Sequence, residues 1–286
     1  MRGFGALAAA AALVLAGCGG GGGGGHAQEA KPAPPGAKRL LASAPQKVAK
    51  AGSSRLSFTY TIDTEALSRP ITMSGEGTFD YARSEGRMTM DIGAFLTAAG
   101  KSGPGRVDVI LTRNAYYLKY PLLSQALKSK KPWIKVDLAD LLKPSGIDVS
   151  SLQLNQSDPS QTLVYLKATG KVEQVGTETI DGVETTRYHA TTDLDRVPAQ
   201  APKRIRAAVR ASVSKLRDQY GISELPLDAW IDRQGLPRQL REEIDVTTQG
   251  QELKVSSTVH FSDYGVQVHV VPPPAGQVND ISELSG

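Results

Sequence analysis

Apolar and polar residues alternate along much of this chain, and most regularly between residues 225 and 274. Alternation with a period of two predicts antiparallel strands that have one buried and one solvated face. Gln234-Gly235 and Gln249-Gly250 interrupt the pattern at points where a chain reversal needs a glycine, so the region is predicted to form a meander of long hairpins. The apolar register contains Leu227, Ala229, Ile231, Leu240, Ile244, Val246, Leu253, Val255, Val259 and Phe261.

The same alternation recurs upstream, where Asp181-Gly182 is the strongest hairpin signal in the chain. At several places the alternation gives way to apolar residues at helical spacing. Over residues 202–217 this spacing predicts an amphipathic helix whose polar face is basic. Further strands are predicted at 55–63, 71–81, 86–92, 106–112, 115–120, 133–138, 171–180 and 183–193, and further helical segments at 37–52, 95–99, 139–142 and 160–168. Pro45 should kink the first helix or mark its restart.

The order of elements indicates an α+β protein with a single, strongly curved antiparallel sheet, a half-barrel, and helices on its concave face. A second domain from Lys171 onward is the alternative. It is not favoured, because both halves are antiparallel and neither has an obvious helix layer of its own.

The N-terminus has the layout of an export signal. Residues 1–17 combine Arg2 with an uninterrupted Ala/Leu/Val core that is too short to span a bilayer. Leu15-Ala16-Gly17-Cys18 follows the pattern of a bacterial lipobox, and Cys18 is the only cysteine, so we expect it to be acylated rather than disulfide-bonded. The glycine- and proline-rich stretch 18–36 is predicted to be a tether, which places the folded body at the extracytoplasmic face of a membrane.

Charge and motifs argue against several functional classes. A net charge of +4 is too small and too dispersed to indicate nucleic-acid binding. No nucleophile elbow, phosphate-binding loop or dinucleotide fingerprint occurs, so no enzyme activity and no cofactor are predicted. His26, His189, His260 and His269 lack metal-ligand spacing, and no metal is predicted. Glu242 falls in the opposite register to Glu243 and Asp245, so this acidic run does not form a glycosidase pair.

Several phrases resemble the actinobacterial LppX/LprG-type lipoproteins over most of residues 37–274. They are AGSSRLSFTYT, WIKVDL, YLKATGKVEQVGTETIDGVETTRYHATTDL, LPLDAWIDRQGLPRQLREEID and FSDYGVQVHVVPPP. The resemblance implies a LolA/LolB-like half-barrel that encloses an apolar cavity for the acyl chains of lipids or glycolipids. It also implies that such lipids are carried or presented in the cell envelope, with a membrane transporter as a possible partner. The glycine tether and Pro45 depart from the family's pattern.

Two sets of candidate site residues follow. Under the implied fold, the cavity would be lined by Leu56, Phe58, Tyr60, Phe79, Met88, Met90, Val109, Leu111, Tyr117, Ile134 and Val136. The alternative is that these side chains fill a closed core, which would leave an envelope scaffold or sensor that binds a partner protein. On the basic helix, Arg204, Arg206, Arg210 and Arg217 either meet anionic headgroups at the membrane surface or form an ordinary solvated face. Residues 275–286 are predicted to be a flexible tail.

Overall fold

The computed structural model describes residues 31–65, 67–137, 169–200, 206–248 and 251–281. The predicted signal segment, Cys18, Arg204 and the helical segments expected at 139–142 and 160–168 lie outside these residues.

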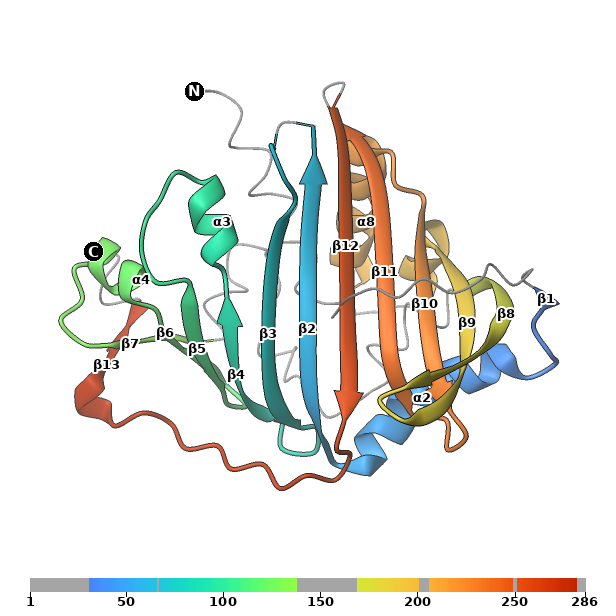
Figure 1. The fold of residues 1–286 in the computed structure, drawn as a ribbon, viewed down its shortest axis with the longest axis horizontal. Coiled ribbons are helices and arrows are strands. Elements are labelled where there is room, and N and C mark those ends of the chain that lie inside the picture. The colour runs from blue at the N-terminus through green and yellow to red at the C-terminus, as the bar shows by residue number, and fades with distance from the viewer. Residues whose placement is uncertain (1–30, 66, 138–168, 201–205, 249–250, 282–286) are drawn as a thin grey trace.

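One thirteen-stranded sheet forms the framework of the described chain. Its strands follow the order β1-β8-β9-β10-β11-β12-β2-β3-β4-β5-β6-β7-β13 (Figure 1). Neighbouring strands pair antiparallel, except for β13, which pairs in parallel with β7. The strands span Lys31–Pro32 (β1), Ser53–Thr64 (β2), Ile71–Asp80 (β3), Glu85–Asp91 (β4), Arg106–Leu111 (β5), Ala115–Lys119 (β6), Trp133–Asp137 (β7), Thr169–Ile180 (β8), Val183–Asp193 (β9), Glu224–Asp232 (β10), Pro237–Thr248 (β11), Gln251–Ser262 (β12) and Val278–Asp280 (β13).

The helices are few. They comprise α2 (Ala37–Ala51), α3 (Gly93–Ala98), α4 (Pro121–Ala126), α7 (Val197–Gln200) and α8 (Arg206–Tyr220), with 3-10 turns η2 (Leu194–Arg196) and η3 (Ala275–Gln277). Pro45 lies inside α2 without ending it, and Gly52 follows with a positive φ of 85°, a conformation that favours glycine.

The helices α2, α3 and α8 contact the same face of the sheet, which we call the inner face. The buried side chains of α2, among them Leu41 and Ala44, lie against Ala190, Ala229 and Ile231. Phe95 of α3 and Tyr220 of α8 join a second cluster around Ile62 and Val255. The α+β class with a single curved antiparallel sheet is therefore confirmed, and the register of every predicted strand of the meander agrees with its apolar pattern.

Two turn residues hold the β10–β11 hairpin. Gly235 has a φ of 78°, and the buried carboxylate of Asp232 accepts hydrogen bonds from the backbone N–H groups of Gln234 and Leu236, both at 2.9 Å. The second oxygen of Asp232 pairs with Arg238 at 2.8 Å. The phrase DRQGLPR is thus a structural signature of this turn.

The two ends of the described chain differ from the prediction. Lys31 and Pro32, expected in the tether, pair with β8 at Gln174 and Glu173. The connection after Ser262 leaves the meander and crosses below the ends of the strands to the far edge of the sheet (Figure 1). There η3 and β13 occupy part of the segment predicted as a flexible tail.

Specific side-chain contacts hold β13 in place. The segment therefore forms a strand although its sequence has no alternation of apolar and polar residues. Lys135 forms ion pairs with Asp137 at 2.6 Å and Asp280 at 3.1 Å, and hydrogen bonding to Asp137 is the largest cause that raises the Lys135 pKa to about 12. Asn279 donates to Ser129 Oγ at 2.8 Å.

Candidate lipid-binding face

The inner face of β2 to β7 is a broad apolar surface. The ladders align Leu56 with Gly77, Met88, Val109, Leu118 and Ile134 across six strands. Adjacent rows carry Phe58 beside Met90 and Val107 on one side, and Phe79 beside Leu111, Tyr116 and Val136 on the other. We call this surface the open apolar face.

The structure places all but one of the predicted cavity residues on this face. Tyr117 is the exception, because it pairs with Lys135 and Ile110, whose side chains lie on the opposite, outer face. Tyr116 takes the inner position. Two adjacent tyrosines made the period-two pattern ambiguous there, and the polar Lys135 and Asp137 of the paired strand were the signal that could have decided the register. Sequence reasoning also missed Met73, Val107 and Leu118.

Burial varies across the open apolar face. Val107, Val109, Ile134 and Val136, on β5 and β7, are at most 6% exposed. By contrast Leu56, Phe58, Phe79, Met88 and Met90, on β2 to β4, are only half-buried. None of these nine residues belongs to the three helix-packed clusters that the described residues form. Large flexible side chains at partly buried positions are suited to contact a varied apolar ligand.

Three positions on this face, Gly75, Gly77 and Gly86, carry no side chain. A Cβ at Gly75 would collide with the Phe58 ring and lie 2.7 Å from the Thr89 carbonyl oxygen, and one at Gly86 would lie 2.7 Å from the Phe79 ring. The rings of Phe58 and Phe79 therefore occupy the space that a side chain at Gly75 or Gly86 would need. Glycine at these positions leaves room for the aromatic side chains on this face.

The basic helix α8 does not present a free cationic cluster within the described residues. Arg217 pairs with Asp195 at 2.6 Å and with Asp218 at 3.6 Å. Arg206 is half-buried and its guanidinium approaches the Ala199 carbonyl at 3.5 Å. Arg210 is exposed. Binding of α8 to membrane headgroups stays a prediction, with Arg210 as its most accessible described member.

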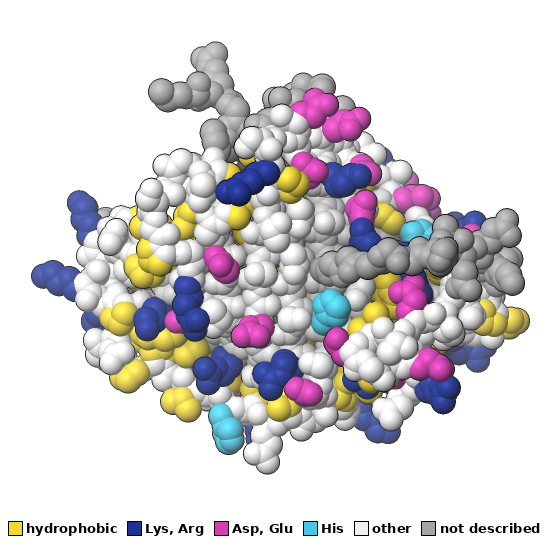
Figure 2. Space-filling model, viewed as in Figure 1, with side chains coloured by type: hydrophobic (Ala, Val, Ile, Leu, Met, Phe, Trp, Pro, Cys, Tyr) yellow, Lys and Arg dark blue, Asp and Glu magenta, His cyan; other side chains and the backbone are white. Residues whose placement is uncertain are grey.

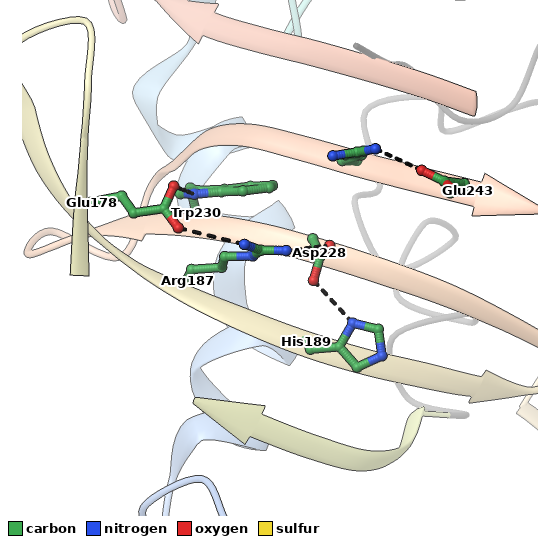
Figure 3. A network of polar contacts seen from close by, with 7 residues as sticks. Glu178, Arg187, His189, Asp228, Trp230 and Glu243 are labelled. Carbon is green, nitrogen blue, oxygen red and sulfur yellow. Dashed lines mark hydrogen bonds and ion pairs between the residues drawn. The ribbon is translucent and has the colours of Figure 1, made fainter. Parts of the chain in front are cut away.

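The outer face of β8 to β11 carries a charge network instead (Figure 3). Asp228 accepts from Arg187 at 3.0 Å and contacts His189 Nδ1 at 2.9 Å. The Arg187 guanidinium lies 4.9 Å from the ring centroid of Trp230, whose indole N–H donates to Glu178 at 2.8 Å. Each described cation in this network has a carboxylate partner, so the network mainly fastens the β8–β9 hairpin over Trp230, which is 4% exposed.

A shallow pocket of about 240 Å³ opens beside this network, lined by Arg187, His189, Pro226, Leu227, Asp228, Arg241 and Glu243. Its lining is charged, so it does not suit an acyl chain. Basic and acidic side chains are also interspersed over the rest of the face seen in Figure 2, without one strongly charged patch. An enclosed apolar cavity stays a prediction, since the described residues supply one wall of it.

Neither a metal-binding cluster nor a membrane-spanning helix occurs within the described residues. No cluster of three or more His, Cys, Asp or Glu there could hold a metal ion. No helix within those ranges has the length and apolarity needed to cross a bilayer.

Comparisons with known proteins place the chain beside actinobacterial relatives. No family model matches it. A 31.2 kDa protein from the rplA–rplJ intergenic region of Streptomyces griseus is 30% identical over 196 residues, covering 68% of this chain and 62% of that protein. A candidate lipoprotein of Streptomyces coelicolor, SCO4650, is 25% identical over 241 residues, which is 82% of this chain and 72% of that protein.

Two mycobacterial proteins of known structure match the chain at low sequence identity. LprF of Mycobacterium bovis is 13% identical with a TM-score of 0.44, and covers 86% of this chain and 100% of its own. The Mycobacterium tuberculosis lipoprotein LppX is 15% identical with a TM-score of 0.46, and covers 82% and 100% respectively. LppX and the Streptomyces coelicolor relative are both named as lipoproteins, the class of protein that this sequence resembles.

Proposed function

We propose that this protein is a membrane-anchored, extracytoplasmic lipoprotein that binds the acyl chains of lipids or glycolipids on its open apolar face. It would carry or present them in the cell envelope. The observation that carries the proposal is the half-buried set Leu56, Phe58, Phe79, Met88 and Met90, which lies outside the helix-packed core of the described residues. The lipobox at Cys18 and the likeness to a candidate lipoprotein support the anchor.

Burial of hydrocarbon would supply the binding free energy. Each methylene removed from water contributes about 0.8 kcal/mol, so a long acyl chain gains on the order of 10 kcal/mol before ordering costs are subtracted. The thioethers of Met88 and Met90 adapt to chains of different shape. No bond is made or broken, so binding and release alone would move the lipid.

A pair of substitutions on one strand tests the site. Met90→Trp fills the open apolar face, while Arg87→Trp adds the same ring to the outer face of β4, where Arg87 is exposed. We expect organic extraction and mass spectrometry of the purified full chain to find acyl lipids with wild type and Arg87→Trp. The amount should fall several-fold with Met90→Trp. Equal lipid content in folded wild type and Met90→Trp would contradict this placement.

A partner-binding scaffold or sensor is the second candidate. The outer pocket beside Arg187 and Asp228 favours it, because partly exposed charged side chains with fixed geometry are suited to a protein partner. This function predicts that extraction of wild-type protein yields no stoichiometric lipid.

A further inference from the structure

A polar row crosses the inner face among apolar neighbours. The ladders place Glu242 of β11 opposite Ser257 of β12, and Ser257 opposite Tyr60 of β2. The rows on either side are apolar: Ile244, Val255 and Ile62 lie on one side, and Leu240, Val259 and Phe58 on the other. The row begins beside Leu227 and ends beside Met73, so it leads into the open apolar face.

Two of its three members carry a buried hydroxyl without a hydrogen-bond partner. The Tyr60 hydroxyl and the Ser257 Oγ are both inaccessible to water, and Ser257 as a whole is 3% exposed. Buried polar groups are normally hydrogen-bonded, so orphaned hydroxyls in adjacent positions require an explanation.

Glu242 lies at the other end of the row and makes no ion pair with any described cation. Burial raises the pKa of its carboxyl, and burial, followed by the charge of Glu242, raises the pKa of Tyr60 to about 12. Strands are spaced about 4.8 Å apart, so the Glu242 and Tyr60 backbones lie about 10 Å apart with Ser257 between them.

We propose that Tyr60, Ser257 and Glu242 form a subsite for a free hydroxyl group of the bound lipid, with its acyl chains on the open apolar face. A hydroxyl both donates and accepts, so it can donate to the Glu242 carboxyl and accept from Tyr60 or Ser257. An ester carbonyl only accepts, so it can pair with Tyr60 or Ser257 but offers no donor to Glu242. A phosphate group is disfavoured, because its negative charge would lie beside the Glu242 carboxylate and no described cation is there to neutralise it. The proposal rests on the proposed function, because it names the class of lipid held there.

The test uses the full chain and two fluorescent probes that carry the same label on one acyl chain: a diacylglycerol with a free hydroxyl, and a fully esterified triacylglycerol. We expect wild type to bind the diacylglycerol more tightly. The double variant Tyr60→Phe, Ser257→Ala should lose about 3- to 10-fold in affinity for the diacylglycerol and less than 2-fold for the triacylglycerol. Tyr117→Phe removes a hydroxyl from the outer face of β6, away from the row and the open apolar face, and should leave both affinities unchanged.

Thermal unfolding of the ligand-free variants separates a binding role from a structural one. Removing an orphaned buried hydroxyl should leave the melting temperature unchanged or raise it. A lowered melting temperature with equal losses for both probes would mean that the row is structural, and would overturn the proposal. Equal binding of both probes by wild type and the double variant would also overturn it while leaving acyl binding intact, whereas failure of wild type to bind either probe would refute the proposed function itself.

Discussion

The two halves of the sheet share the same alternating pattern but differ in how far their inner side chains are buried. In the half formed by β8 to β12, small side chains such as Ala190 and Ala229 receive α2, and their exposure falls to 1%. In the half formed by β2 to β7, glycines alternate with Phe58, Met88 and Met90, which stay half-buried. Alternation therefore determines which side chains share a face. The size of the side chains on that face and on the opposing helix affects how completely each position is covered.

The largest expected effect lies in the packed half. Asp232→Ala removes the carboxylate that fixes the β10–β11 turn and leaves Arg238, 19% exposed, without its partner. We expect a loss of about 3–5 kcal/mol in the free energy of unfolding, measured by urea titration. Asp263→Ala breaks the exposed pair with Arg55 and should cost less than about 1 kcal/mol. Similar losses in both variants would show that the turn is not the anchor of this half.

A matched truncation in each half measures their difference in packing directly. Ile231→Ala, at a position 2% exposed against α2, should cost about 3 kcal/mol through the lost contacts and the cavity. Leu56→Ala on the open apolar face should cost about 1 kcal/mol in the ligand-free protein, because Leu56 is only half-buried. If the two values were equal in urea titrations, the distinction between a filled and an open half would be lost.

The glycines of the open half can be tested next. Gly75→Ala places a Cβ against the Phe58 ring and 2.7 Å from the Thr89 carbonyl oxygen, and should cost about 2 kcal/mol. Phe58→Leu in the same protein should recover only part of this cost, since the backbone contact remains. Full recovery in the double variant would show that the ring alone requires the glycine.

The smallest effect concerns the charge on the inner face. Burial raises the Glu242 pKa above its value in the unfolded chain, so the folded state binds the extra proton and stability falls as pH rises through this range. Glu242→Gln should therefore raise the melting temperature at pH 7, and this gain should disappear at a pH below the pKa of an unfolded glutamate, about 4.3. A constant difference across pH 4 to 7 would contradict an unfavourable buried charge.

Much of this fold could be predicted because strand alternation and turn glycines are local signals. The β8–β9 hairpin at Asp181-Gly182 and the meander from residue 224 follow from them. The placement of β13 could not be predicted in this way, since it depends on Lys131, Lys135 and Ser129, which lie about 145 to 150 residues earlier in the chain.

The sequence predicted most of the residues on the open apolar face, but not the orientation of every one. Period-two reasoning placed Met88 and Met90 correctly but put Tyr117 inward, because an adjacent tyrosine offered the same pattern. The polar row of Tyr60, Ser257 and Glu242 has no signature along the chain. Its members come from three strands and meet only through the pairing of β12 with both β11 and β2.

The parallel pairing of β13 with β7 also affects how the molecule can associate. Three of the five residues of β7 are already paired on that side by the chain's own C-terminal segment. An edge strand with unpaired backbone groups is a template for intermolecular pairing. A second copy that extended the sheet through β7 would first have to displace Val278–Asp280, so removal of this short segment is expected to promote sheet-to-sheet association between molecules.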